Sequence, residues 1–178
     1  AQIAFQRMLD TSKEDSTRLN AVANLARIHQ FQNSLEELLS EFTGRIRNTP
    51  KKFAAYEELA RIHQETGELE KSLTTLENGL ENVDDKAPAL QALIRSAYEL
   101  QDFQKVLAFY EQLIEQRGKP SPYEYERLGS IYAQLGDLSK ARDTWDMMIN
   151  AADKNPKAYD RLASVLQREN FIGEAIEY

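Results

Sequence analysis

Apolar residues recur along the chain at the spacing of amphipathic helices, and the same arrangement returns five times. Each unit is centred on a leucine, with mainly apolar or small side chains three residues before it and one and four residues after it. Residues at these offsets lie on one face of a helix. The five leucines are Leu25, Leu59, Leu93, Leu128 and Leu162. The pattern predicts an all-α protein built from repeated helices.

A break is predicted after each of these helices. Eight residues beyond the leucines stand Asn33, Gly67, Gln101, Gly136 and Asn170. Glycine and asparagine tolerate the left-handed backbone that ends a helix. A second apolar series then opens at Leu35, Leu69, Phe103, Leu138 and Ile172. Each unit is therefore expected to be a pair of antiparallel helices.

A six-residue identity supports this repetition, because LARIHQ at 25–30 returns unchanged at 59–64, 34 residues later. A period of this length indicates stacked supersecondary units. We expect a single array over 1–178, in which residues 1–18 are the second helix of a preceding repeat plus a linker. The repeats are expected at 19–52, 53–86, 87–121, 122–155 and, truncated, 156–178. Because both ends cut a repeat and the chain does not begin with Met, we expect a fragment of a larger protein.

These positions resemble the tetratricopeptide repeat (TPR). The unit at 122–155 is the most similar, with Tyr125, Leu128, Gly129, Tyr132, Gly136, Ala141 and Trp145 at the motif positions. The resemblance implies a right-handed superhelix, or α-solenoid, of stacked antiparallel helix pairs whose first helices line a concave groove. It also implies a protein that binds partners, without indicating which partner.

An arginine is expected on the groove side of every repeat. The residue before each leucine and the residue two after it lie opposite the apolar stripe. Between them, these two positions hold Arg27, Arg61, Arg95, Arg127 and Arg161. Because arginine presents a rigid set of donors suited to carboxylate and phosphate groups, the groove is predicted to bind an acidic peptide, a phosphopeptide or a C-terminal carboxylate.

Other interpretations of these arginines stay open. Glu57 lies one helical turn before Arg61 and would occupy its guanidinium group, and charged helix faces are often simply solvated. Lys157 and Arg161 match the last pair of the carboxylate clamp that some TPR proteins use. The other clamp positions hold Gln91, Arg95 and Arg127, so a clamp is not expected.

Three aromatic residues are expected near the groove, namely Phe31, Tyr98 and Tyr123. Their rings would stack on a ligand or anchor an amphipathic segment. The alternative is that each ring covers a neighbouring helix.

Composition narrows the function. A net charge of −7 argues against broad nucleic-acid binding, and no apolar run approaches the roughly 20 residues of a membrane span. Without cysteine there is neither a disulfide framework nor a thiolate zinc site, and the compartment stays open, with the cytoplasm slightly favoured. No phosphate loop, nucleophile elbow or zinc-protease motif is present, so neither catalysis nor a cofactor is expected. His29 and His63 are expected to be packed, hydrogen-bonded residues rather than metal ligands.

The leading hypothesis is a non-catalytic scaffold for protein–protein interaction whose groove binds an extended or helical, acidic segment of a partner. The second is a structural segment of a larger repeat protein, which self-associates through the exposed ends of the array. The third is an RNA-binding helical repeat, against which the acidic composition counts.

Overall fold

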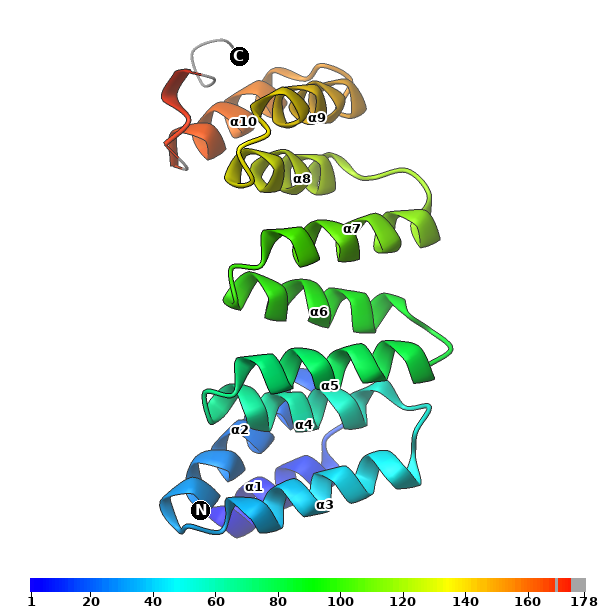
Figure 1. The fold of residues 1–178 in the computed structure, drawn as a ribbon, viewed down its shortest axis with the longest axis vertical. Coiled ribbons are helices and arrows are strands. Elements are labelled where there is room, and N and C mark those ends of the chain that lie inside the picture. The colour runs from blue at the N-terminus through cyan, green and yellow to red at the C-terminus, as the bar shows by residue number, and fades with distance from the viewer. Residues whose placement is uncertain (169, 174–178) are drawn as a thin grey trace. The chain divides into compact units, whose positions relative to one another are not determined.

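The computed structural model describes residues 1–168 and 170–173, and every regular element in these ranges is helical (Figure 1). The all-α class is therefore confirmed. The chain forms two compact units, unit 1 at 1–102 and unit 2 at 103–178. Their boundary falls between the two helices of the repeat expected at 87–121, so the single array stays a prediction.

Unit 1 contains six helices: α1 (Gln2–Thr11), α2 (Asp15–Phe31), α3 (Leu35–Asn48), α4 (Phe53–Glu65), α5 (Leu69–Asn82) and α6 (Ala87–Glu99). In Figure 1, α2 runs antiparallel to α3 and α4 runs antiparallel to α5. The first helices α2 and α4 pack together, as do α5 and α6. Helix α1 packs on α2 and buries Leu9.

Helix α2 begins at Asp15, four residues before the expected repeat boundary at residue 19. Residues 1–18 therefore contain, in addition to a preceding helix and a linker, the first turn of α2. Asp15 lies in its first turn, where a carboxylate is stabilised by the helix dipole. This first turn is polar, and a boundary inferred from apolar residues therefore misses it.

Unit 2 has four helices in its described part: α7 (Phe103–Arg117), α8 (Pro122–Gln134), α9 (Leu138–Ala151) and α10 (Pro156–Arg168). Helices α8 and α9 form an antiparallel pair, with α7 against α8 and α10 against α9. A capping box precedes α8: Glu124 N donates to Ser121 Oγ at 3.3 Å, and Ser121 N donates to Glu124 Oε2 at 2.8 Å. Residues 172 and 173 are helical, and the expected continuation over 174–178 lies outside the described residues.

All five predicted breaks are confirmed by left-handed backbone. The φ angles are +56° at Asn33, +80° at Gly67, +56° at Gln101, +81° at Gly136 and +66° at Asn170. In every case the amide of the following residue donates to the carbonyl five residues before it, at 2.8–3.0 Å. This is the Schellman closure of a helix. It satisfies a carbonyl at the end of each first helix and turns the chain back on itself.

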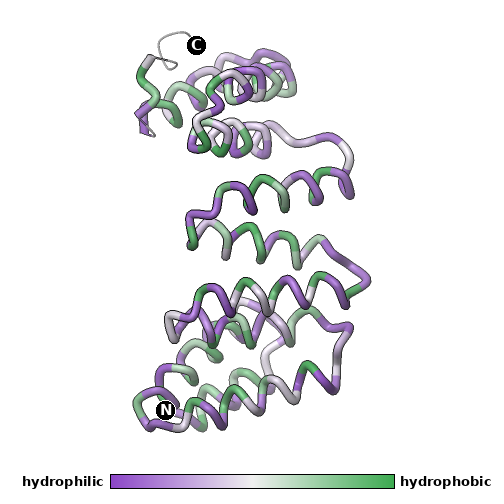
Figure 2. Tube along the Cα trace, viewed as in Figure 1, coloured by the Kyte–Doolittle hydropathy of each residue, from purple (hydrophilic) through white to green (hydrophobic). Residues whose placement is uncertain are grey.

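The core consists of the predicted apolar positions. All five repeat leucines are buried, and so are Phe42, Leu76, Tyr110 and Trp145 from the second helices. Figure 2 shows hydrophobic and hydrophilic positions alternating along the helices of both units. Within unit 2 the closest packing joins α8 to α9, because a Cβ atom at Gly129 would lie 2.1 Å from Nε1 of Trp145. The indole therefore packs directly on bare backbone.

Replacing Gly129 by alanine is expected to destabilise unit 2 by about 1–3 kcal/mol, because the buried indole would have to move. The matched control is Gly44→Ala in α3, where a Cβ atom meets nothing within 4 Å. That change should stabilise the helix by up to about 1 kcal/mol. Urea unfolding followed by circular dichroism measures both effects. Equal effects of the two substitutions would contradict the packing argument.

Candidate partner-binding site

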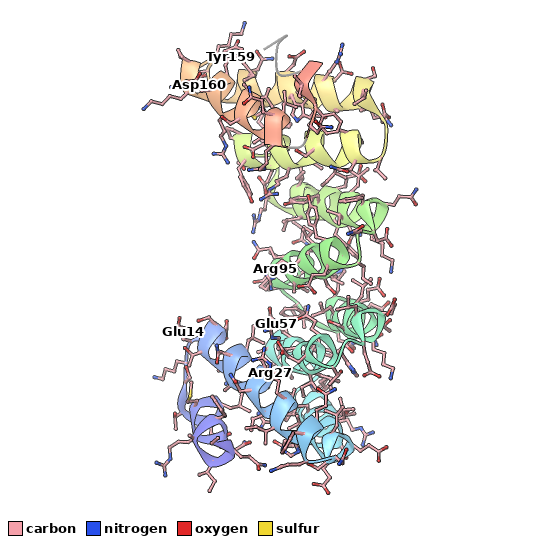
Figure 3. All side chains as sticks on the ribbon, turned by 90° about the vertical axis from the view of Figure 1, so that its left-hand side faces the viewer. Glu14, Arg27, Glu57, Arg95, Tyr159 and Asp160 are labelled. Atoms are coloured by element: carbon pink, nitrogen blue, oxygen red, sulfur yellow. The ribbon has the colours of Figure 1, made fainter. Side chains whose placement is uncertain are left out.

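The three predicted arginines of unit 1 lie on successive first helices, with Arg27 on α2, Arg61 on α4 and Arg95 on α6. Figure 3 shows Arg27 and Arg95 on one side of unit 1, together with Glu57 of α4. The side chains of Arg27 and Arg95 are 60% and 62% exposed, whereas Arg61 is more enclosed. They are therefore accessible to solvent, as a binding surface requires.

Each of these arginines is paired with a glutamate. Arg27 Nε donates to Glu65 Oε2 at 2.7 Å, and Arg61 Nη2 lies 2.6 Å from Glu65 Oε1. Arg95 Nη2 donates to Glu57 Oε1 at 2.8 Å. Glu65 thus bridges two arginines from neighbouring helices. The positive charge predicted for this side of unit 1 is largely neutralised within the unit.

Glu57 is the carboxylate of this group whose titration is most affected by its surroundings. Burial raises its pKa, and nearby Asp15 and Glu58 raise it further, while Arg95 opposes the shift. Glu58 itself is only 3% exposed and accepts from Arg18 Nε at 3.0 Å. Glu58 is therefore paired with an arginine of α2 and not with those of α4 and α6.

A pocket of about 190 Å³ lies between α4 and α6, and we call it the α4–α6 pocket. Leu19, Ala60, Leu76 and Ala92 supply its apolar lining. Its charged lining consists of two arginines and two glutamates, Arg61, Arg95, Glu57 and Glu99. Tyr98, also on α6, is half-buried and lies outside this pocket.

In unit 2 the structure brings three predicted residues together. The guanidinium carbons of Arg127 and Arg161 lie 5.3 and 5.5 Å from the ring centroid of Tyr123. Arg127 Nε also donates to the Tyr123 hydroxyl at 3.0 Å. These distances are those of cation–π contacts, and Tyr123 remains 46% exposed.

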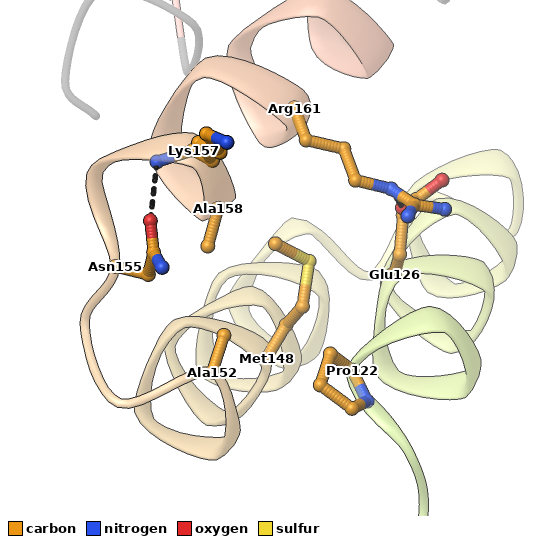
Figure 4. Close-up of a pocket in the computed structure, with 8 residues that line it drawn as sticks. All are labelled: Pro122, Glu126, Met148, Ala152, Asn155, Lys157, Ala158 and Arg161. Carbon is orange, nitrogen blue, oxygen red and sulfur yellow. Dashed lines mark hydrogen bonds and ion pairs between the residues drawn. The ribbon is translucent and has the colours of Figure 1, made fainter.

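Lys157 and Arg161 of α10 line a second pocket, of about 270 Å³, with apolar Met148, Ala152 and Ala158 (Figure 4). Arg161 forms an ion pair with Glu126 of α8. The Glu126 side chain is only 7% exposed. Lys157 is exposed. We call Tyr123, Arg127, Lys157 and Arg161 the basic face of unit 2.

Sequence reasoning considered Glu57 as the partner of Arg61. In the structure Glu57 pairs with Arg95, and Arg61 pairs with Glu65 one turn later in α4. Sequence reasoning also missed the pairs that join neighbouring helices. The pairs Arg27–Glu65 and Glu57–Arg95 are each separated by 38 residues. This distance is one repeat of 34 residues plus the four residues of a helical turn. A search for opposite charges at that separation would have found both pairs.

The two histidines are hydrogen-bonded, as predicted. Nδ1 of His29 lies 2.9 Å from Ser34 Oγ, and Nδ1 of His63 lies 2.9 Å from Glu68 Oε2. Among the described residues, no group of three or more histidine, aspartate or glutamate side chains is placed to hold a metal ion. No helix in the same ranges is long and apolar enough to span a bilayer.

Replacing Glu57 by glutamine is expected to change how stability depends on pH. Because the pKa of Glu57 is raised above its ordinary 4.5, the folded protein binds this proton more tightly than the unfolded chain does. The wild type therefore loses stability as pH rises through the raised pKa. The free energy of unfolding of Glu57→Gln, relative to wild type, should increase between pH 4.5 and about pH 7.

Urea unfolding at the two pH values measures this difference. The control is Glu37→Gln, at an exposed position of α3, for which a smaller change is expected. A relative stability of Glu57→Gln that falls with pH would contradict the assignment.

No family model and no curated protein matches this chain. Solved structures match it over most of its length. A putative kinesin light chain from Podosopora anserina, with nearly identical TPR-like repeats, has a TM-score of 0.59 at 19% identity and 93% coverage of both chains. MamA from Desulfovibrio magneticus RS-1 gives 0.55 at 14% identity, with 89% of both chains covered.

A thermophilic TPR protein from Thermus thermophilus gives a TM-score of 0.51 at 19% identity, covering 93% of this chain and 89% of the other. Similarity at these identities establishes the fold and leaves the partner open. It confirms the resemblance inferred from the motif residues. The chain has the fold of TPR-like repeat proteins.

Proposed function

We propose that this protein is a non-catalytic scaffold that binds an extended or helical, acidic segment of another protein on the groove side of its first helices. The observation that supports this most directly is the basic face of unit 2. Two guanidinium groups, those of Arg127 and Arg161, lie over one exposed aromatic ring there. Lys157 lines the adjoining pocket together with Arg161, which pairs with Glu126.

Charge balance favours unit 2 over unit 1 as the place where the acidic segment binds. In unit 1, Glu57 and Glu65 already accept from all three predicted arginines. In unit 2, Lys157 is exposed and lies beside the pocket that it lines with Arg161. A carboxylate arriving at the basic face would therefore meet the exposed ammonium group of Lys157.

The strength of such binding would depend on several contacts together. An exposed ion pair contributes only about 0.2–1 kcal/mol and is weakened by salt. The pocket beside Lys157 and Arg161 adds apolar surface from Met148, Ala152 and Ala158. An acidic segment that also presents an aliphatic side chain would use both kinds of contact.

Substitution of Lys157 tests this proposal. Peptides rich in aspartate and glutamate should bind the wild type in a salt-sensitive way. Lys157→Glu should lower their affinity by at least about tenfold, because one attraction is lost and one repulsion is added. Arg161 is less suitable for this test, because its loss would leave Glu126 buried and unpaired.

The matched control is Arg142→Glu, which makes the same change in charge at an exposed position of α9. Fluorescence anisotropy at two salt concentrations measures both variants. Equal weakening by the two substitutions would show a general charge effect and would overturn the assignment of the basic face.

Self-association is a second candidate function, and exposed apolar side chains in unit 1 favour it. Ile3 of α1 is 81% exposed, and Phe31 at the end of α2 is 90% exposed. The bond between Gln2 Nε2 and His29 Nε2, 3.1 Å long, holds these two helix ends together. Exposed apolar side chains that gather into one patch mark contact surfaces between proteins.

Light scattering across a hundredfold dilution tests self-association. The average mass of the wild type should fall on dilution, and the double substitution Ile3→Ser and Phe31→Ser should give a monomer throughout. A wild type that stays monomeric at the highest concentration would exclude this candidate.

A further inference from the structure

The α4–α6 pocket of unit 1 differs from the basic face of unit 2 in its charge. Its lining combines Arg61 and Arg95 with Glu57 and Glu99 around an apolar floor. Two positive and two negative side chains make the lining neutral as a whole. A ligand for this pocket therefore differs from the acidic segment expected at unit 2.

The charged groups of the pocket form ion pairs that do not use all of their hydrogen-bond donors and acceptors. A guanidinium group has five N–H donors and a carboxylate has two acceptor oxygens. Arg95 Nη2 bonds to Glu57 Oε1, and Arg61 Nη2 pairs with Glu65 outside the pocket. Arg61 Nε is buried without a hydrogen-bond partner in the described part of the chain. Since Nε has almost no accessible surface, the hydrogen-bonding capacity of the pocket wall comes from the other N–H groups of the two guanidiniums and the second oxygens of the glutamates.

The chain's own residues indicate which group suits this wall. Gln64, which also lines the pocket, donates from Nε2 to Glu99 Oε2 at 3.1 Å. A neutral carboxamide is therefore already bonded at the rim. It donates to a carboxylate, and its carbonyl oxygen is of the kind that accepts from a guanidinium.

Other ligand groups fit less well. A carboxylate would be repelled by Glu57 and Glu99, and an ammonium group would be repelled by Arg61 and Arg95. An alkyl group would remove water from four charged side chains without replacing its hydrogen bonds. A carboxamide offers two donors and one acceptor with no net charge, and its carbon chain would lie against Ala60 and Ala92.

We propose that the α4–α6 pocket binds the side-chain carboxamide of an asparagine or glutamine from the partner. The inference deepens the proposed function, since it assumes that the partner lies along the first helices of unit 1. The amide accepts from Arg61 and donates to Glu57. For unit 1, the inference predicts a partner segment that carries an amide side chain.

Small probes test the pocket directly, without a known partner. The full chain is labelled with ¹³C on alanine methyl groups, and the Ala60 and Ala92 signals are followed during titration with propionamide or with its charged isostere propionate. Propionamide should shift both signals and should saturate at a concentration at least about tenfold lower than propionate. Equal or tighter binding of propionate overturns the proposal.

A third probe, N-methylpropionamide, mimics a backbone amide. It should bind more weakly than propionamide, because its methyl group replaces one of the two donors. If it binds more tightly, the occupant is a backbone amide, and the assignment to a side chain is wrong.

A matched pair of variants locates the effect. Arg61→Lys keeps a positive charge beside Glu65 but removes the guanidinium from the pocket wall. It should lower the affinity for propionamide by at least about tenfold. Arg47→Lys makes the same change at an exposed position of α3 that does not line the pocket, and it should leave binding unchanged. Equal behaviour of the two variants overturns the role of Arg61.

The comparison of probes on the wild type stands even if a variant fails to fold. These titrations report on unit 1 alone, whereas the binding of acidic peptides depends on Lys157 in unit 2. Failure of the amide site and failure of the acidic-segment proposal are therefore distinguished.

Discussion

The closure of each first helix is the interaction on which the rest of the structure depends. A left-handed residue eight positions after the repeat leucine lets the next amide bond back to the last turn of the helix, as at Asn33 and Gly67. This bond turns the chain, so that the second helix runs back along the first. Gln101 adopts the same conformation, although a side chain other than glycine or asparagine makes it less favourable by about 1–2 kcal/mol. The hydrogen bonds that close the helix therefore outweigh the preference of glutamine for a right-handed or extended backbone.

Ion pairs between first helices follow from this regular spacing. Because neighbouring first helices pack side by side in unit 1, a charge on α2 or α6 reaches the opposite charge on α4. The result is a polar side on which guanidinium and carboxylate groups are matched. In unit 2 the arginines Arg127 and Arg161 lie over the ring of Tyr123, and the two units consequently present different chemistry.

The sequence was sufficient for the fold wherever the determinant is local. Helix pairs and the breaks between them were predicted because apolar spacing and turn residues act within a few positions. The early start of α2 was missed because its first turn is polar. The pairing of Arg27 with Glu65 was missed because it joins residues 38 positions apart. The division into two units depends on packing between helices, which a pattern along one helix does not contain.

The spacing of charges on α4 has a consequence for how such a chain can grow. Glu57, Arg61 and Glu65 lie four residues apart on this helix, and the pairs across helices lie 34 plus four residues apart. A second copy of this repeat, inserted directly after the first, would therefore bring its own Arg61 equivalent opposite Glu57 and its own Glu65 equivalent opposite Arg61. Duplication of the segment would generate a charge-matched junction without any further substitution. The hexapeptide LARIHQ occurs twice, once with Arg27 and once with Arg61. Growth by duplication leaves such repeated segments in a sequence.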